Sequence, residues 1–269
     1  MPELPEVETI KRTLSRNLVG QKILDCEIRL AKLVRPEPEI FSDLVKDKKI
    51  LGLKRRGKFL LFHLSQDLFL LFHFRLTGQL IYTQNGPEPP YTHLRFDLEN
   101  GKLFYADLRQ FGTIEALRKD ELLHHPSLLK LGREPFDLTA EEFYSLLKGR
   151  RRKLKALLLD QSVIAGLGNI YVDETLFRAG LHPAREASSL SFKEASNLHQ
   201  IICEVLQEAI ATGGSSVRNY VDGEGKNGRF QEQHLVYGKR GKPCPRCGTL
   251  ISYTTIASRG THFCPVCQR

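Results

Sequence analysis

Four of the six cysteines lie near the end of the sequence in the pattern C-x2-C-x16-C-x2-C, at Cys244, Cys247, Cys264 and Cys267. Each C-x2-C pair can present two thiolates to one ion, and the residues between the pairs are long enough to form a β-hairpin that brings the pairs together. Four thiolates complete a tetrahedral zinc site and leave no position for a substrate. The spacing therefore predicts one structural Zn2+ that holds residues 239–269, a unit too small to fold on its own core. Unliganded or redox-active pairs are the less favoured alternative.

The 269 residues suffice for two ordinary domains, and they carry 40 Lys and Arg against 31 Asp and Glu, a net charge of +9. The basic excess is spread over both halves of the chain, which favours a polyanionic partner lying across both, nucleic acid first and an anionic membrane surface second. The longest apolar stretch, residues 68–74, is interrupted by His73 and is too short to cross a bilayer. With no secretory signal pattern and cysteines in metal-site spacing, we expect a soluble cytoplasmic protein.

The hydrophobic patterning divides the chain into three parts. Up to about residue 131, short β-prone segments follow a helical first stretch and predict an antiparallel β-sandwich or barrel, including a hairpin turn at 99–101. From Thr139 the period becomes helical, and two helices are expected to meet at the turn 165–168. We therefore predict an α+β multi-domain protein with domains at 1–131, 132–238 and 239–269. The strands are expected within 22–30, 49–64, 68–83, 93–108 and 113–117, and the later helices within 139–147, 154–169, 170–180 and 191–214.

Basic residues cluster in three separate places: residues 54–58, residues 150–155, and the zinc unit, where Arg259 is expected at or near the tip of the hairpin. An arginine held there can reach a phosphate with its planar guanidinium. Each cluster alone is more typical of a solvated surface. Together they indicate one long groove for a nucleic acid.

The first ten residues, MPELPEVETI, raise a choice about Pro2. Apolar residues at helical spacing predict an amphipathic helix over 3–19, and proline with several glutamates is typical of a first helical turn. If Met1 is removed, however, Pro2 also becomes a free secondary amine. The residues alone leave both interpretations open.

Four segments and the spacing of the zinc finger together resemble formamidopyrimidine-DNA glycosylase, also called 8-oxoguanine DNA glycosylase. The resemblance runs in order through the chain, in PELPEVET after Met1, RRGKFL, DLRQFG, AGLGNIYVDE and the terminal four-cysteine finger. It implies an N-terminal antiparallel β-sandwich with flanking helices, a helical domain with a helix–two-turn–helix, and a C-terminal zinc finger, with double-stranded DNA in the cleft between the domains. It also implies a bifunctional DNA glycosylase and AP lyase of base excision repair, a monomer acting on oxidised bases or abasic sites at the bacterial nucleoid.

The same resemblance assigns chemical roles to four residues. Pro2 is the implied nucleophile, which attacks C1′ of the damaged nucleotide and forms a Schiff base. Glu3 matches the acid/base carboxylate, and Lys58 the lysine that engages phosphate and assists elimination. Arg259 matches the arginine that grips phosphates and is assigned to δ-elimination. Glu6 either tunes the Pro2 amine or only caps the helix.

Further positions match the family's DNA contacts. Base extrusion leaves a hole in the duplex that side chains must fill, and three residues occupy the void-filling positions. Leu76 replaces a common methionine of similar volume, and Leu108 and Gln110 also depart from the usual residues. Residues 213–231 resemble a mobile loop that closes over the extruded base. The void-filling residues are Leu76, Arg109 and Phe111, and the other contacts are His73, His93, Arg150 and Asn169.

Two rival interpretations stay open. The endonuclease VIII branch shares the fold and the proline nucleophile but prefers oxidised pyrimidines; Leu4, where that branch usually has glycine, favours the purine branch. A zinc-containing DNA-binding protein without catalysis explains the charge and the finger. It does not explain why Pro2, Glu3 and Lys58 occur together.

Overall fold

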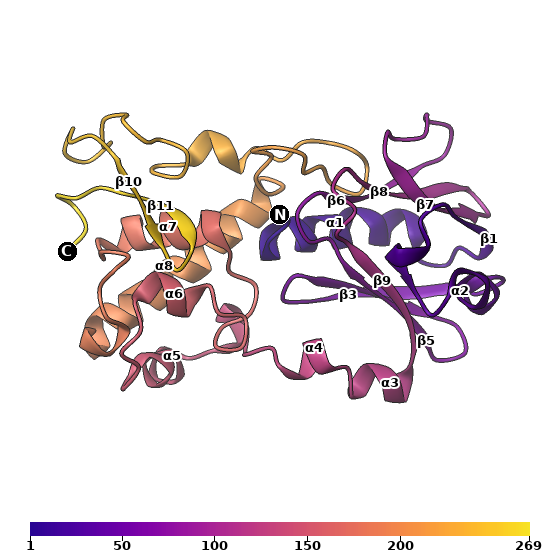
Figure 1. Cartoon of the computed structure of the whole chain (residues 1–269), viewed down its shortest axis with the longest axis horizontal. Helices are drawn as coiled ribbons and strands as arrows, with labels where there is room; N and C mark the ends of the chain where they lie inside the picture. Colours follow the sequence, from indigo (N-terminus) through magenta and orange to yellow (C-terminus); the bar gives the residue numbers. More distant parts are fainter. The chain divides into compact units, whose positions relative to one another are not determined.

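The computed structural model describes residues 1–269, and the chain divides into two compact units. The first contains Met1–Leu129 and Thr212–Gln231, and the second contains Lys130–Ala211 and Glu232–Arg269. The predicted division at residues 131 and 238 stays a prediction. Figure 1 follows the chain through both units in sequence colours.

The first unit is a β-sandwich, as the resemblance implies. One sheet has the strand order β1-β7-β8-β6 and the other has the order β2-β9-β5-β4-β3. All neighbours are antiparallel except β2 and β9, which pair in parallel. The strands are β1 (Ile23–Ile28), β2 (Val34–Arg35), β3 (Ile50–Arg56), β4 (Phe59–Leu64), β5 (Leu68–His73), β6 (Gly78–Thr83), β7 (Thr92–Leu98), β8 (Gly101–Asp107) and β9 (Thr113–Arg118).

Helices flank the sandwich, as expected. Helix α1 (Leu4–Leu18) packs against strands of both sheets, namely β3, β4 and β6. Its apolar face is fully buried in the same core as Phe62 and Phe72 of one sheet and Phe96 and Tyr105 of the other. This spacing of apolar residues at every third or fourth position is what predicted the helix. The other helices of this unit are α2 (Pro38–Val45), α3 (Lys119–Leu123) and α4 (Pro126–Leu129), with a 3-10 turn at Ala31–Leu33.

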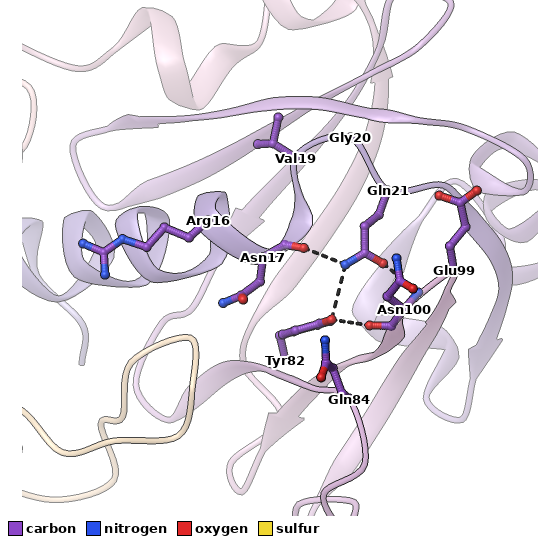
Figure 2. Close-up of a pocket in the computed structure, with 9 residues that line it drawn as sticks. All are labelled: Arg16, Asn17, Val19, Gly20, Gln21, Tyr82, Gln84, Glu99 and Asn100. Atoms are coloured by element: carbon purple, nitrogen blue, oxygen red, sulfur yellow. Dashed lines mark hydrogen bonds between the residues drawn. The ribbon is translucent and has the colours of Figure 1, made fainter.

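The end of α1 is tied to the sandwich through a polar hollow (Figure 2). The Gln21 side chain donates hydrogen bonds to the Asn17 carbonyl, at 2.6 Å, and to the Tyr82 hydroxyl, at 3.3 Å, and it accepts one from the Asn100 backbone N–H at 2.9 Å. The Tyr82 hydroxyl in turn donates to the Asn100 carbonyl. The hollow joins α1 to the β7–β8 turn, and none of the predicted site residues lines it.

The second unit is helical, with a β-hairpin at its end. Helix α7 packs against α8, α6 and β11, and α8 also packs against α5. Thr139 begins α5 with a side-chain hydrogen bond to the Glu142 N–H, and Gly180 ends α7 in the left-handed conformation, at φ 70°. The helices are α5 (Ala140–Leu147), α6 (Leu154–Leu158), α7 (Asn169–Ala179) and α8 (Phe192–Ala211), the 3-10 turns are Pro135–Asp137, Ala187–Ser189 and Phe230–Gln233, and the hairpin is β10 (Ser252–Ile256) with β11 (Arg259–Phe263).

One predicted helix is wrong beyond its first turns. The apolar pattern of 154–169 suggested a continuous helix, but α6 ends at Leu158. Asp160 accepts hydrogen bonds from the Ser162 N–H and hydroxyl, and the Gln161 amide bonds the Leu159 and Leu167 carbonyls and the Gly166 N–H. These side chains satisfy backbone groups locally, and the buried residues 163–167 form a turn and bends, with an isolated β-bridge between Ile164 and Arg133, instead of a helix.

Candidate functional site

The N-terminus of α1 holds the first group of predicted residues. Pro2 is buried directly before the helix, and Glu3 is its N-cap residue. The Glu3 backbone N–H donates to Glu6 Oε2 at 2.8 Å, which closes a capping box. Glu3 and Glu6 are 3% and 1% exposed. Two carboxylates are therefore held in a largely dry environment beside residue 2.

Glu6 also ties the N-terminus to the glycine-rich segment 213–231. Its Oε1 accepts a hydrogen bond from the Ser215 backbone N–H at 2.8 Å, and Tyr220 donates its hydroxyl hydrogen to the Glu6 or Gly213 carbonyl. Gly214 lies so close that a side chain there would come within 2.9 Å of Glu6 Oε1. Capping, the simpler of the two predicted roles of Glu6, is thus present in the structure, together with a second contact that the sequence did not suggest.

Lys58 belongs to the same neighbourhood. It is only 7% exposed and follows Gly57, whose positive φ of 56° makes the turn between β3 and β4. Burial lowers the pKa of the Met1 α-ammonium; Glu3 and Glu6 oppose this shift, and Lys58 and Arg218 reinforce it. An amine at this end of the chain therefore has carboxylates that can accept its proton and cations that favour its neutral form.

His73 ends β5 next to this group. Its register partner is Phe59, the residue after Lys58, and the two rings meet edge to face at 4.5 Å between centroids. Burial, with contributions from Arg75 and Lys58, lowers the pKa of His73 to about 4. His73 is thus neutral at physiological pH, and its Nδ1 accepts a hydrogen bond from the Arg75 N–H.

The three predicted void-filling residues lie on two loops that join the sheets. Leu76 lies between β5 and β6, and Arg109 and Phe111 lie between β8 and β9. Phe111 is 53% exposed, and the Arg109 guanidinium lies 5.2 Å from the centre of its ring. An exposed aromatic ring under a cation is a surface on which a base can stack. His93 lies nearby in β7, with its Nε2 3.0 Å from the Asp107 carbonyl oxygen.

The second unit carries Arg150, Asn169 and Arg259. Arg150 and Arg259 are exposed, and Arg259 begins β11 directly after the hairpin turn, as expected. Asn169 is the first residue of α7, and its Nδ2 donates to the Gly260 carbonyl at 2.9 Å, while its buried Oδ1 has no hydrogen-bond partner. Gly260, the residue after Arg259, is therefore hydrogen-bonded to the first residue of α7. The backbone N–H groups at the start of a helix favour an anion there.

Lys155 corrects the prediction made for the basic run 150–155. The sequence places Lys155 in a cluster expected to bind a nucleic acid, but the side chain of Lys155 is fully buried. Its Nζ lies 2.6 Å from Asp173 Oδ1 and donates to the Gly260 carbonyl at 2.9 Å. One residue of the basic run 54–58 is also neutralised within the protein, because Arg55 Nε forms an ion pair with Glu8 Oε2 at 3.0 Å. Fewer basic side chains face solvent than the sequence suggested.

The four cysteines of the hairpin unit fit one zinc ion. Their sulfur atoms all lie within 4.8 Å of one another, with 3.8 Å between those of Cys244 and Cys267 and 3.5 Å between those of Cys247 and Cys264. Tetrahedral Zn–S bonds of about 2.3 Å place the sulfurs roughly 3.8 Å apart, whereas a disulfide needs about 2.05 Å. All four ligand positions are filled by protein, so the ion is structural.

Comparison with known proteins agrees with these features. The model of the formamidopyrimidine-DNA glycosylase N-terminal domain matches residues 1–114, the H2TH domain of the same enzyme matches 131–221, and the zinc finger found in FPG and IleRS matches 241–269. The formamidopyrimidine-DNA glycosylase of Heliobacterium modesticaldum is 47% identical over 277 residues and is covered completely, as is this chain. The chain belongs to the formamidopyrimidine-DNA glycosylase family. The relative from Pelotomaculum thermopropionicum is 46% identical, over 100% of this chain and 99% of the other.

Solved structures of the formamidopyrimidine-DNA glycosylase family have the same fold. The Lactococcus lactis protein in complex with DNA containing Fapy-dG has a TM-score of 0.92 at 41% identity, over 99% of this chain and all of the other. The same protein with DNA containing an abasic site has a TM-score of 0.93 at 41% identity, over 99% of both chains. The predicted family, fold class and structural zinc are thereby confirmed. No helix in the chain is both long and apolar enough to cross a membrane.

Sequence reasoning missed three residues at this site. Ser215 lies in the segment 213–231, which resembles a loop over the extruded base, but it received no role of its own. Asp173 and Asp107 stand inside quoted motifs, YVDE and DLRQFG, but received no role. For the two aspartates, the signal available in the sequence was an acidic residue within a motif that is otherwise apolar or turn-forming.

Proposed function

We propose that this protein is a bifunctional DNA glycosylase and AP lyase that excises oxidised purines, 8-oxoguanine and formamidopyrimidines, from double-stranded DNA. The observation that carries the proposal is at the start of α1. There Pro2 lies beside the buried carboxylates of Glu3 and Glu6, and the buried Lys58 of the β3–β4 turn acts on the same terminus. The names of the relatives and the lesion DNA in the solved Lactococcus lactis complexes support this substrate class. Acting on chromosomal DNA, a bacterial protein of this kind would work in the cytoplasm at the nucleoid.

The nucleophile in this proposal is the nitrogen of Pro2 after removal of Met1. With Met1 present that nitrogen is a tertiary amide whose lone pair is delocalised. As a terminal amine, with a pKa of roughly 8 against roughly 10.4 for lysine, more of it is neutral at physiological pH. It attacks C1′ of the damaged nucleotide, the base departs with the bonding electrons and a proton, and an iminium links Pro2 to the opened sugar.

Glu3 supplies protons at the sugar. Its carboxyl group is buried, and it lies next to the residue that attacks. It would protonate the ring oxygen of the deoxyribose as the ring opens, and then accept protons released in later steps. The cationic iminium withdraws electrons from C2′, so loss of a 2′ proton expels the 3′ phosphate (β-elimination), and a second elimination expels the 5′ phosphate.

Phosphate contacts come from the basic residues of both units. Lys58 would engage a phosphate beside the lesion and assist elimination, and Arg259 would hold the flanking phosphates and assist the second elimination. Asn169, His73, His93 and Arg150 would position the backbone. Leu76, Arg109 and Phe111 would fill the space left by the extruded base. Zinc bound to the four thiolates would keep the hairpin folded and so hold Arg259 in place.

A nicking assay on a lesion panel tests the function. We expect cleavage of a duplex with 8-oxoguanine opposite cytosine, with phosphates left on both sides of a one-nucleotide gap. Faster cleavage at an oxidised pyrimidine such as thymine glycol would favour the endonuclease VIII specificity. Binding of lesion DNA without cleavage of any substrate would leave only the non-catalytic alternative.

A further inference from the structure

Two loops join the sheets side by side at one end of the sandwich. Strands β5 and β9 are neighbours in one sheet, with His73 opposite Thr113, and β6 and β8 are neighbours in the other, with Gly78 opposite Asp107. The loop 74–77 therefore crosses from one sheet to the other next to the loop 108–112. The topology places Leu76 on one loop beside Arg109 and Phe111 on the other.

A buried carboxylate connects these two loops, beside a direct hydrogen bond from the Arg109 N–H to the Thr77 hydroxyl oxygen at 3.0 Å. Asp107 is 1% exposed, and its Oδ1 accepts hydrogen bonds from the Thr77 hydroxyl and from the Arg109 N–H at 3.2 Å. Its Oδ2 accepts from the Phe111 N–H at 2.9 Å and the Gly112 N–H at 2.8 Å. A carboxylate offers about four acceptor positions, so the four donors saturate it. All four come from the two loops.

The surroundings leave the carboxylate little freedom to move. A side chain at Gly112 would come within 1.7 Å of the Tyr105 hydroxyl, and one at Gly78 within 2.4 Å of the same oxygen. The Tyr105 hydroxyl is buried without a hydrogen-bond partner, and burial, reinforced by Asp107, raises the pKa of Tyr105 well above its usual value. The same side chain at Gly112 would come within 3.2 Å of Asp107 Oδ2, so Tyr105 and the Gly112 backbone pack closely beside the carboxylate.

The loops themselves adopt conformations that need such support. Arg75 has φ 51° and Gln110 has φ 58°, both in the left-handed region that costs energy for residues other than glycine. Each lies next to a void-filling residue. Hydrogen bonds that a carboxylate accepts are stronger than those between neutral groups. Asp107 accepts hydrogen bonds from the N–H groups of Arg109 and Phe111, the residues on both sides of Gln110.

We propose that Asp107 is a positioning residue that locks Leu76, Arg109 and Phe111 into one rigid wedge for the space left by the extruded base. Asp107 acts through the Thr77 hydroxyl and the backbone of the loop 108–112, and does not itself touch DNA. This inference rests on the proposed function, because a wedge is needed only where a base leaves the stack. A rigid wedge matters because loops ordered only on insertion would lose conformational entropy at that step.

The test is Asp107→Asn, with Asp97→Asn as the matched control. The asparagine has one acceptor oxygen, and its NH2 group would face two of the four donors. Asp97 lies on the neighbouring strand β7 and contacts the Arg95 side chain, so its replacement removes the same charge without affecting the loops. We expect the single-turnover excision rate of 8-oxoguanine opposite cytosine to fall at least tenfold in Asp107→Asn. With the lesion opposite an abasic analogue, where no base pair is broken, the rate should fall less than threefold. Asp97→Asn should match the parent protein on both substrates.

A fluorescent cytosine analogue placed opposite an abasic-site analogue reports wedge insertion without catalysis. The parent protein should change its emission on binding, and Asp107→Asn should lose most of that change at saturating protein. Equal slowing of Asp107→Asn on both substrates, or an unchanged rate on the paired one, would overturn the proposal. A parent protein that alters the fluorescence but excises no base would refute the proposed function and leave the wedge standing.

A second variant covers the case in which Asp107→Asn does not fold. Thr77→Val keeps the shape of the side chain and removes the hydroxyl, which donates to Asp107 and accepts the Arg109 N–H. We expect a threefold or greater loss confined to the paired substrate. Parent rates on both substrates would contradict the proposed link between the loops.

Discussion

Replacing Lys155 by methionine is expected to destabilise the helical unit strongly. The ammonium group lies 2.6 Å from Asp173 Oδ1, and both side chains are fully buried. Asp173 Oδ2 in turn accepts the His262 backbone N–H at 2.9 Å, so the pair links α6, α7 and β11. Methionine keeps an unbranched side chain of similar length and removes the ammonium group, with its charge and its hydrogen bonds to Asp173 and the Gly260 carbonyl.

The size of the effect follows from what is left behind. Losing one partner of a buried ion pair costs about 3–5 kcal/mol, because the other charge stays buried without compensation. Asp173 retains the His262 N–H, and the Gly260 carbonyl retains the Asn169 amide, which favours the lower end of that range. We therefore expect a loss of about 3 kcal/mol in the free energy of unfolding, or about 10 °C in the melting temperature of this unit.

Urea unfolding followed by circular dichroism measures this loss, because the chain has no tryptophan for fluorescence. Release of zinc to a chromophoric chelator in the same titration reports the helical unit separately. Lys153→Met is the control, since that neighbouring side chain is exposed and should change stability by less than about 0.5 kcal/mol. A Lys155→Met protein within 1 kcal/mol of the parent would refute the claim that the pair fastens the hairpin.

Three further outcomes are expected. Cys247→Ser should release the zinc, disorder the hairpin and weaken DNA binding through loss of the Arg259 contact, while the sandwich stays folded; normal lesion cleavage by a zinc-free protein would contradict this. If about four to six phosphates are neutralised, a plot of the logarithm of the DNA association constant against the logarithm of the salt concentration should have a slope of roughly −4 to −5. A flat plot would argue against a groove of basic residues that binds DNA. Burial lowers the pKa of His73 to about 4, so between about pH 6.5 and 4 the unfolded chain binds the proton that the folded one does not, and stability should fall as the pH falls. In His73→Gln that decline should be smaller by about 2–3 kcal/mol in urea titrations at several pH values; an identical decline would show that His73 is not the group responsible.

Local patterns predicted much of the fold. The first helix, the strands of the sandwich and the zinc hairpin depend on periodicity and spacing within short segments, and the structure has all of them. The residues 159–168 were predicted wrongly because their apolar content was read as a helical pattern. There the polar side chains of Asp160 and Gln161 bond the backbone, and burial comes from tertiary packing.

Long-range pairs were beyond a pattern-based analysis. Lys155 stands in a run of basic residues that is typical of a solvated surface, and only the packing of α6 on α7 brings Asp173 to it. Asp107 gains its role from two loops that approach because the strands on both sides are sheet neighbours. In both cases the chemistry was visible in the sequence, but the partner was not.

Covalent trapping tests the central claim most directly. Borohydride added during turnover of a duplex with 8-oxoguanine opposite cytosine should reduce the iminium and leave the DNA attached to the protein, and peptide mapping should locate the attachment at Pro2 of a chain that lacks Met1. A protein with a permanent extra residue before Pro2 should bind lesion DNA but neither excise the base nor form the adduct. An adduct on Lys58, or full activity with the blocked terminus, would show that Pro2 is not the nucleophile.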